Sequence, residues 1–125
     1  MYDNDLLYGN FYLTLKVYEL SKSFDISSDY GSIKIYKLFN NFDEVSIDGE
    51  YTGVKIGVAN DASFNFDTQT SYSGINFEDL EVDYSFKEDA MSSKKYKGNV
   101  NGANSNSILK ITSSYGGIKI YKSDY

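Results

Sequence analysis

The sequence predicts an all-β fold in which a single chain winds into a β-solenoid with coils of about 21 residues. One observation is a repeat: a strand, a small polar turn, a tyrosine, a glycine and a second strand recur four times. Another is the spacing of Tyr30, Tyr51 and Tyr72, which are 21 residues apart, with Tyr115 another 43 residues on. A third is that no ten-residue stretch has a convincing helical period.

The four copies cover residues 24–38, 45–59, 66–80 and 109–123. Aligned with one another, they place similar residues at every second position. The apolar columns are Phe24, Val45, Phe66 and Leu109; Ile26, Ile47, Thr68 and Ile111; Ile33, Val54, Ile75 and Ile118; and Ile35, Ile56, Phe77 and Ile120. Because strands alternate with period two, each column lies on one face, and stacked copies turn it into a ladder with rungs about 4.8 Å apart. The predicted interior is therefore dry and aliphatic.

Each copy turns a corner next to its tyrosine. We expect Gly31, Gly53, Gly74 and Gly116 to adopt positive φ angles there, because glycine has no Cβ to clash. We expect most of the repeated tyrosines to belong to the core, with the hydroxyl at the corner.

The strand patterns are rich in β-branched and aromatic residues and are separated by turn-forming residues. In chain order they cover residues 11–20, 32–38, 44–47, 53–58, 63–66, 74–77, 80–86, 108–111 and 117–121. Residues 87–96 offer only Ala90 and Met91 for burial, so we expect a turn-rich excursion with at most one helical turn. Residues 96–100 match a fifth copy only loosely, and residues 98–107 are predicted to form a loop inserted at one corner.

All 125 residues are expected to form one domain, and its abrupt start suggests a fragment of a longer chain. Residues 1–20 are expected to cap one end of the stack. The last strand ends the chain one strand after Tyr115, so we expect an open edge there. Either a second copy covers this edge by self-association through the terminal coil, or Lys122 and Asp124 blunt it. The alternative fold is an antiparallel β-sandwich or barrel, since two hairpin strands give a similar spacing. A sandwich, however, gives no reason for column-by-column identity.

Composition excludes several classes of function. The net charge is −6 and all 12 basic residues are lysine, which argues against nucleic acid as a partner despite 13 tyrosines that could stack on bases. The chain has no histidine and no cysteine, which excludes imidazole and thiol catalysis and zinc or iron–sulfur sites with those ligands. No apolar run is long enough to predict a transmembrane segment, and the first residues do not form a signal peptide.

Two segments carry a resemblance to known proteins. Residues 27–35 (SSDYGSIKI) and 113–120 (SSYGGIKI) resemble the bacterial adhesin repeat families, which include auto-transporter-adhesin head domains and relatives in Bacteroidetes envelopes. The resemblance covers most of residues 24–122, although Ser32 and Gly117 stand where the family usually places Asp. It implies a single-chain β-solenoid, export from the cytoplasm and no established enzymatic activity.

Residues 77–83 (FEDLEVD) are the most acidic segment. On a strand, Asp79, Glu81 and Asp83 share one face. Three carboxylates could bind Ca²⁺, the one cofactor that the sequence suggests, and a pair could hydrolyse a glycosidic bond. The plainer interpretation, which we favour, is a solvated strand face.

Lys34, Lys55 and Lys119 occupy one outward column, with Asn76 in the remaining copy, and Tyr36 and Tyr121 lie in the next outward column. Stacked lysines repel unless acids lie beside them, and Asp25, Asp48 or Asp67 could supply those acids. This stripe could bind an acidic glycan or a lipid headgroup, because tyrosine offers sugars an apolar face and a polar tip. Alternatively, it is a charged face that keeps a flat β surface soluble.

We therefore expect a non-enzymatic, extracytoplasmic module of the cell envelope or secreted space. It would act as an adhesin-like or scaffold surface for a glycan or another protein. One alternative is a carbohydrate-active enzyme on the same scaffold that uses the carboxylates near residues 79–83. Another is a self-assembling structural module.

Overall fold

The computed structural model describes residues 14–20, 22–40, 42–102 and 106–123, which form eleven strands and no helix. The predicted all-β class is thus confirmed. The strands are β1 (Thr14–Leu20), β2 (Phe24–Ser28), β3 (Gly31–Leu38), β4 (Glu44–Glu50), β5 (Thr52–Val58), β6 (Phe64–Ser71), β7 (Ile75–Glu78), β8 (Val82–Asp89), β9 (Ser93–Val100), β10 (Ile108–Ser114) and β11 (Ile118–Lys122).

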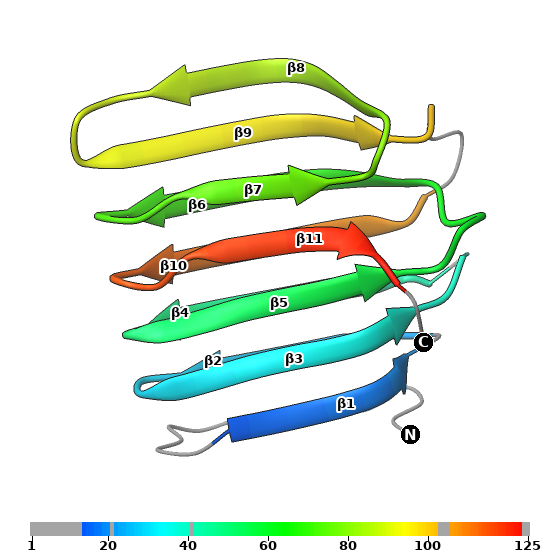
Figure 1. Cartoon of the computed structure of the whole chain (residues 1–125), viewed down its shortest axis with the longest axis horizontal. Coiled ribbons are helices and arrows are strands. Elements are labelled where there is room, and N and C mark those ends of the chain that lie inside the picture. Colours follow the sequence, from blue (N-terminus) through cyan, green and yellow to red (C-terminus); the bar gives the residue numbers. More distant parts are fainter. Residues whose placement is uncertain (1–13, 21, 41, 103–105, 124–125) are drawn as a thin grey trace.

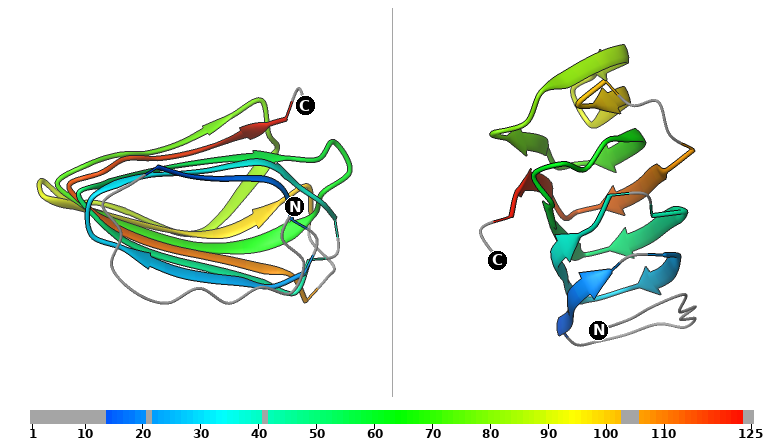
Figure 2. Two further views of the ribbon diagram at one scale, coloured as in Figure 1. Left: turned by 90° about the horizontal axis from the view of Figure 1, so that it is seen from below. Right: turned by 90° about the vertical axis from the view of Figure 1, so that its right-hand side faces the viewer.

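The strands form two facing sheets (Figure 1). Sheet A has the order β1-β3-β5-β11-β7, and sheet B has the order β2-β4-β10-β6-β9-β8. Each repeat copy is an arch, in which one strand of sheet B turns tightly into one strand of sheet A. Seen end-on, the two sheets converge where these turns lie and diverge at the opposite side (Figure 2). Neighbouring arches pair in parallel in both sheets, which the antiparallel sandwich does not explain.

The register of these pairs confirms the predicted columns. Ile47 lies opposite Ile26 on one side and Ile111 on the other, and Ile111 in turn lies opposite Thr68. In sheet A, Ile56 has Ile35 and Ile120 as its two neighbours. These isoleucines are buried and line the space between the sheets. Similar side chains therefore pack on one another along the stack, as the alignment of copies predicts.

The order of the arches differs from their order in the sequence. The C-terminal arch, β10–β11, lies between β4–β5 and β6–β7 and pairs with both in each sheet. The prediction that the last strand leaves an open edge is therefore wrong, and the terminal coil is not available for edge-to-edge self-association. The chain skips one rung after β5 and fills it last.

Residues 87–96 are not the turn-rich excursion that the sequence suggests, whereas the strand expected over residues 80–86 overlaps β8. β8 and β9 form an antiparallel hairpin, and β9 also pairs antiparallel with β6, so the hairpin extends sheet B beyond the last arch. The loose fifth copy at residues 96–100 is part of β9, and the predicted insertion at 98–107 begins only after Val100. At the opposite end, β1 is the edge strand of sheet A. The rest of the predicted cap, residues 1–13, lies outside the described residues.

The corners correct two further predictions. Tyr51, Tyr72 and Tyr115 themselves adopt positive φ angles of 51°, 57° and 59°, and of the four predicted corner glycines only Gly31 does so. These tyrosines, together with Tyr30, lie on the surface and not in the core, with 47–63% of each residue exposed. The backbone hydrogen bonding between neighbouring arches continues around the corner. The backbone N–H of Tyr51 donates to the Ser114 carbonyl, that of Tyr115 to the Ser71 carbonyl, and that of Tyr72 to the Ser92 carbonyl, at 2.7–2.9 Å.

Candidate functional site on the outer face of sheet A

A row of lysines crosses the outer face of sheet A. Lys16 lies opposite Lys34, Lys34 opposite Lys55, and Lys55 opposite Lys119, each on the neighbouring strand. Asn76 continues the row on β7. We call Lys16, Lys34, Lys55 and Lys119 the lysine ladder. The structure thus places the three predicted lysines side by side and adds a fourth.

Lys16 was not among the predicted site residues, because residues 1–20 were expected to form a cap. A signal was present, since residues 15–20 (LKVYEL) match residues 33–38 (IKIYKL) position by position. The structure pairs these two segments in that register. Lys16 therefore belongs to the same outward column as Lys34.

Tyr36 and Tyr121 lie beside the lysine ladder, as predicted. Gly57 stands opposite Tyr121, and an added Cβ at Gly57 would lie 3.2 Å from the Tyr121 ring and 2.5 Å from the Tyr36 carbonyl oxygen. The absence of a side chain at Gly57, which is buried, therefore lets the Tyr121 ring and the Tyr36 backbone pack closely over β5. The Ser123 hydroxyl donates to the Tyr36 carbonyl at 2.7 Å and fixes the end of β11 against β3.

The five predicted binding residues line one shallow hollow of about 570 Å³. Its lining residues are Lys34, Tyr36, Lys55, Glu78, Asp79, Lys119, Tyr121, Lys122 and Ser123. Lysines outnumber carboxylates in this lining by four to two. A flat β face thus becomes a concave, basic surface with tyrosines in its wall, the combination that an anionic ligand with apolar surface requires.

The charges on this face are balanced only in part. The Lys119 ammonium lies 3.4 Å from a Glu78 carboxylate oxygen, and the Lys34 ammonium lies 4.5 Å from the centre of the Tyr36 ring. The acids predicted to offset the lysines, Asp25, Asp48 and Asp67, lie on strands of sheet B and not beside the lysine ladder. The positive charge at the centre of sheet A therefore remains available to a ligand.

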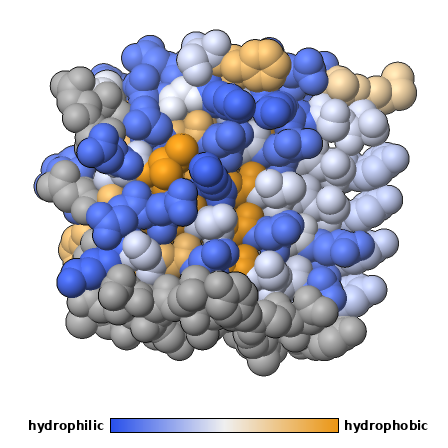
Figure 3. Space-filling model, turned by 180° about the vertical axis from the view of Figure 1, so that it is seen from behind, coloured by the Kyte–Doolittle hydropathy of each residue, from blue (hydrophilic) through white to orange (hydrophobic). Residues whose placement is uncertain are grey.

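The outer face of sheet B has a different character. It is mainly hydrophilic, with apolar side chains showing between the polar ones (Figure 3). Its lysines face acids: Lys97 lies 3.8 Å from Asp67, and Lys110 lies 3.7 Å from Glu44. Sheet B thus provides matched lysines against which those of sheet A can be compared.

The acidic segment does not form the predicted cluster. Asp79 lies in the turn after β7 with a φ of 57°, Glu81 precedes β8, and Asp83 lies within β8. Because the chain turns at Asp79, the three carboxylates do not share one strand face. Within the described ranges, no group of three or more acidic side chains could hold a metal ion.

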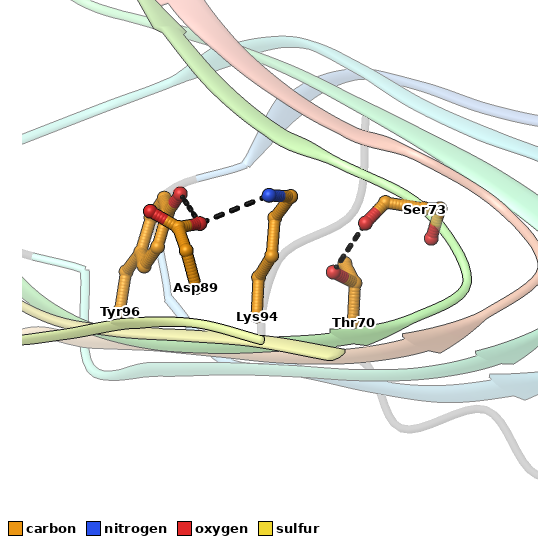
Figure 4. Close-up of polar contacts among 5 residues, drawn as sticks. All are labelled: Thr70, Ser73, Asp89, Lys94 and Tyr96. Carbon is orange, nitrogen blue, oxygen red and sulfur yellow. Dashed lines mark hydrogen bonds and ion pairs between the residues drawn. The ribbon is translucent and has the colours of Figure 1, made fainter. Parts of the chain in front are cut away.

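A second polar cluster lies on the hairpin. The Tyr96 hydroxyl donates to Asp89, and the Lys94 ammonium lies 2.9 Å from the same carboxylate. Figure 4 shows these side chains on the inner side of sheet B, toward sheet A. Burial and the Asp89 bond raise the pKa of Tyr96 to about 12, and the bonds from Tyr96 and Lys94 lower the pKa of Asp89. A further strand stacked here would bury the charged Asp89 and Lys94 side chains, which is unfavourable. These charges therefore oppose further growth of the stack at this end.

Comparisons of the chain with protein-family models, with curated proteins and with solved structures found no match. In the part of the chain that the structure describes, no helix is long and apolar enough to cross a membrane.

Proposed function

We propose that the protein is a non-enzymatic binding module that captures anionic glycan chains on the outer face of sheet A. The observation that supports this proposal best is that Lys34, Lys55 and Lys119 of the lysine ladder line one hollow together with the adjoining tyrosines, in a protein of net charge −6. Neighbouring lysines on one face repel each other, which is unfavourable for folding. Attraction of an anionic ligand to this face would explain why the lysines are gathered there.

The geometry favours a linear ligand. The lysine ladder crosses the strands with one ammonium per rung, and neighbouring strands are about 4.8 Å apart. A polysaccharide with carboxylate or sulfate groups along its length can meet several lysines when it lies across the strands. Tyr36 and Tyr121 can then contact the sugar rings through their apolar faces, while their hydroxyls reach water or sugar hydroxyls.

Binding of a carboxylated or sulfated polysaccharide, measured by calorimetry beside an uncharged polysaccharide of similar length, tests the proposal. We expect binding of the anionic chain only, weakening as salt is added, since exposed charges are screened. The double substitution Lys55→Gln and Lys119→Gln removes about 0.5–1 kcal/mol per lysine, which lowers the affinity about tenfold.

The matched control is Lys110→Gln with Lys97→Gln, which removes the same charge from sheet B. We expect this variant to bind within about twofold of the unmodified protein. Equal losses in both double variants would show that net charge alone matters and that sheet A holds no site. Equal binding of the uncharged polysaccharide would contradict the proposed role of the lysines.

The carbohydrate-active enzyme is less well supported. Glu78 and Asp79 are the acidic residues among those that line the hollow, and Glu78 is paired with Lys119. The candidate carboxylates Glu81 and Asp83 lie further along the chain, beyond the turn at Asp79. We therefore propose binding without turnover, and an unchanged polysaccharide length after prolonged incubation is the expected result.

We also propose that the arches represent a β-solenoid in which one coil is supplied out of order, and that the module works outside the cytoplasm in the manner of an adhesin or scaffold. The parallel pairing and matched columns support the solenoid description. The resemblance of residues 27–35 and 113–120 to adhesin repeats supports the compartment. Localisation of the tagged protein in its native cell tests it, and retention in the cytoplasm would refute it.

A further inference from the structure

The four corner tyrosines form a continuous stack along the edge where the two sheets meet. The ring centres of Tyr30 and Tyr51 lie 5.2 Å apart, those of Tyr51 and Tyr115 4.8 Å, and those of Tyr115 and Tyr72 4.9 Å. The rings are parallel to within 12°. We call Tyr30, Tyr51, Tyr115 and Tyr72 the tyrosine stack.

The stacking restricts what these rings can do. Tyr51 and Tyr115 each have both faces against a neighbouring ring, so their faces cannot take up a sugar or a nucleobase. About half of each residue is nevertheless exposed, from 47% for Tyr30 to 63% for Tyr72. At a stacked and half-exposed ring, the edge, which includes the hydroxyl and the carbons ortho to it, is the part open to reaction.

The amino-acid composition makes tyrosine the expected target of one-electron oxidation. The chain has no cysteine, no tryptophan and no histidine, so a one-electron oxidant meets no thiol and no indole. Tyrosine is then the most readily oxidised aromatic side chain present. Neighbouring parallel rings place a second tyrosine within about 5 Å of any radical formed in the stack.

We propose that the tyrosine stack is a site of oxidative cross-linking, at which hydrogen peroxide and a haem peroxidase join neighbouring rings as dityrosine. Each of two phenols loses one electron and its hydroxyl proton. The two phenoxyl radicals combine through a carbon ortho to each oxygen, and the hydrogen on each of those carbons moves to the oxygen as the rings regain aromaticity. Two electrons and two protons leave in total, and one peroxide molecule becomes two water molecules.

The bond would lock the out-of-order arch. Tyr115 belongs to the C-terminal arch and lies between Tyr51, which is 64 residues earlier, and Tyr72, which is 43 residues earlier. A bond to either neighbour closes a long loop and fastens β10–β11 in its slot, in the way that a disulfide constrains a chain. This chain cannot form disulfides, since it has no cysteine.

The test treats the dilute full-length protein with peroxidase and hydrogen peroxide, separates monomer from oligomers, and measures dityrosine fluorescence and linked peptides in the monomer. We expect peptides that join Tyr30 to Tyr51 and Tyr115 to Tyr72 or Tyr51. We also expect the cross-linked monomer to unfold at a higher denaturant concentration. Linkage only between chains, or mainly between tyrosines outside the stack, would overturn the proposal.

Tyr115→Phe is the decisive variant, because phenylalanine keeps the ring in the stack but cannot form a phenoxyl radical. One pair instead of two can then couple, so dityrosine in the monomer should fall by about half. Tyr84→Phe is the control, since Tyr84 is 41% exposed but lies outside the stack, and it should leave the yield unchanged. Circular dichroism confirms that both variants fold. An unchanged yield in Tyr115→Phe would refute the proposal.

Discussion

At the scale of single residues, the corners of the arches show how tyrosine can replace glycine in a left-handed conformation. A positive φ costs an ordinary residue about 1–2 kcal/mol. Each ring contact in the tyrosine stack contributes about 0.5–1.5 kcal/mol, which offsets much of that cost.

Gly116, which follows Tyr115, has a different role: an added Cβ there would lie 2.1 Å from the Thr52 carbonyl oxygen. Gly116 is therefore needed for a close approach between arches.

Substitution of Gly116 tests this role. We expect Gly116→Ala to lower the free energy of unfolding by about 1–3 kcal/mol, because the backbone of Thr52 would have to move. Gly53→Ala is the control, since a Cβ there meets no atom within 4 Å, and we expect a change within about 0.5 kcal/mol. Urea unfolding of both variants measures the difference. Equal stability of the two would contradict the close packing at this corner.

The buried phenol of Tyr96 predicts an alkaline loss of stability. Its pKa is about 12 in the folded protein against an ordinary value of 10.0. A raised pKa means that the stabilising contribution is complete below about pH 10 and disappears as the pH approaches 12. Urea unfolding across this range should therefore show a steeper decline for the unmodified protein than for Tyr96→Phe. Parallel declines would show that Tyr96 titrates normally.

At the scale of elements, the pairing register could be predicted from the sequence and the order of the arches could not. The alternation of apolar residues fixes which positions face each other. Ile47, for example, fits equally well beside Ile26 or Ile111. Similar residues in every copy therefore do not show which arches are neighbours in the stack. The hairpin helps to set the order, because Thr68, which replaces the isoleucine of the other copies, donates to the Tyr96 carbonyl at 3.0 Å.

The hairpin was predicted only in part, because the strand expected over residues 80–86 overlaps β8, whereas β9 was expected to be part of an excursion and a loop. β8 is exposed along most of its length, so its part beyond residue 86 lacks the alternation of buried and exposed residues that identifies a strand. The candidate site, too, was predictable from the sequence in part only. Its outward column was predictable from the repeat, whereas the hollow depends on the placement of β11 beside β5, which only the fold reveals.

The interior position of β10–β11 predicts slow hydrogen exchange near the C-terminus. Both strands have hydrogen-bonded neighbours on each side, whereas β8 is an edge strand of sheet B. We expect the amides of Leu109, Ile111 and Ile120 to exchange among the slowest in the protein, and those of β8 to exchange early. Exchange measured by mass spectrometry distinguishes the two. Fast exchange throughout β10 and β11 would mean that the C-terminal arch is not held between its neighbours.

At the scale of the whole molecule, the insertion of the C-terminal arch completes both surfaces. Lys119 is the last lysine of the lysine ladder, next to Lys55, and Tyr115 fills the gap in the tyrosine stack between Tyr51 and Tyr72. Without this arch, the lysine ladder would lose Lys119 and the tyrosine stack would be interrupted between Tyr51 and Tyr72. The proposed glycan binding and the proposed cross-linking therefore depend on the same feature of the topology.

Nuclear Overhauser contacts between backbone protons of the isotopically labelled, full-length protein test this feature most directly. We expect residues 118–121 to show contacts on one side with residues 54–57 and on the other side with residues 75–78, in the parallel register of the structure. Contacts of β11 with one of these strands only, or direct contacts between β5 and β7, would contradict it.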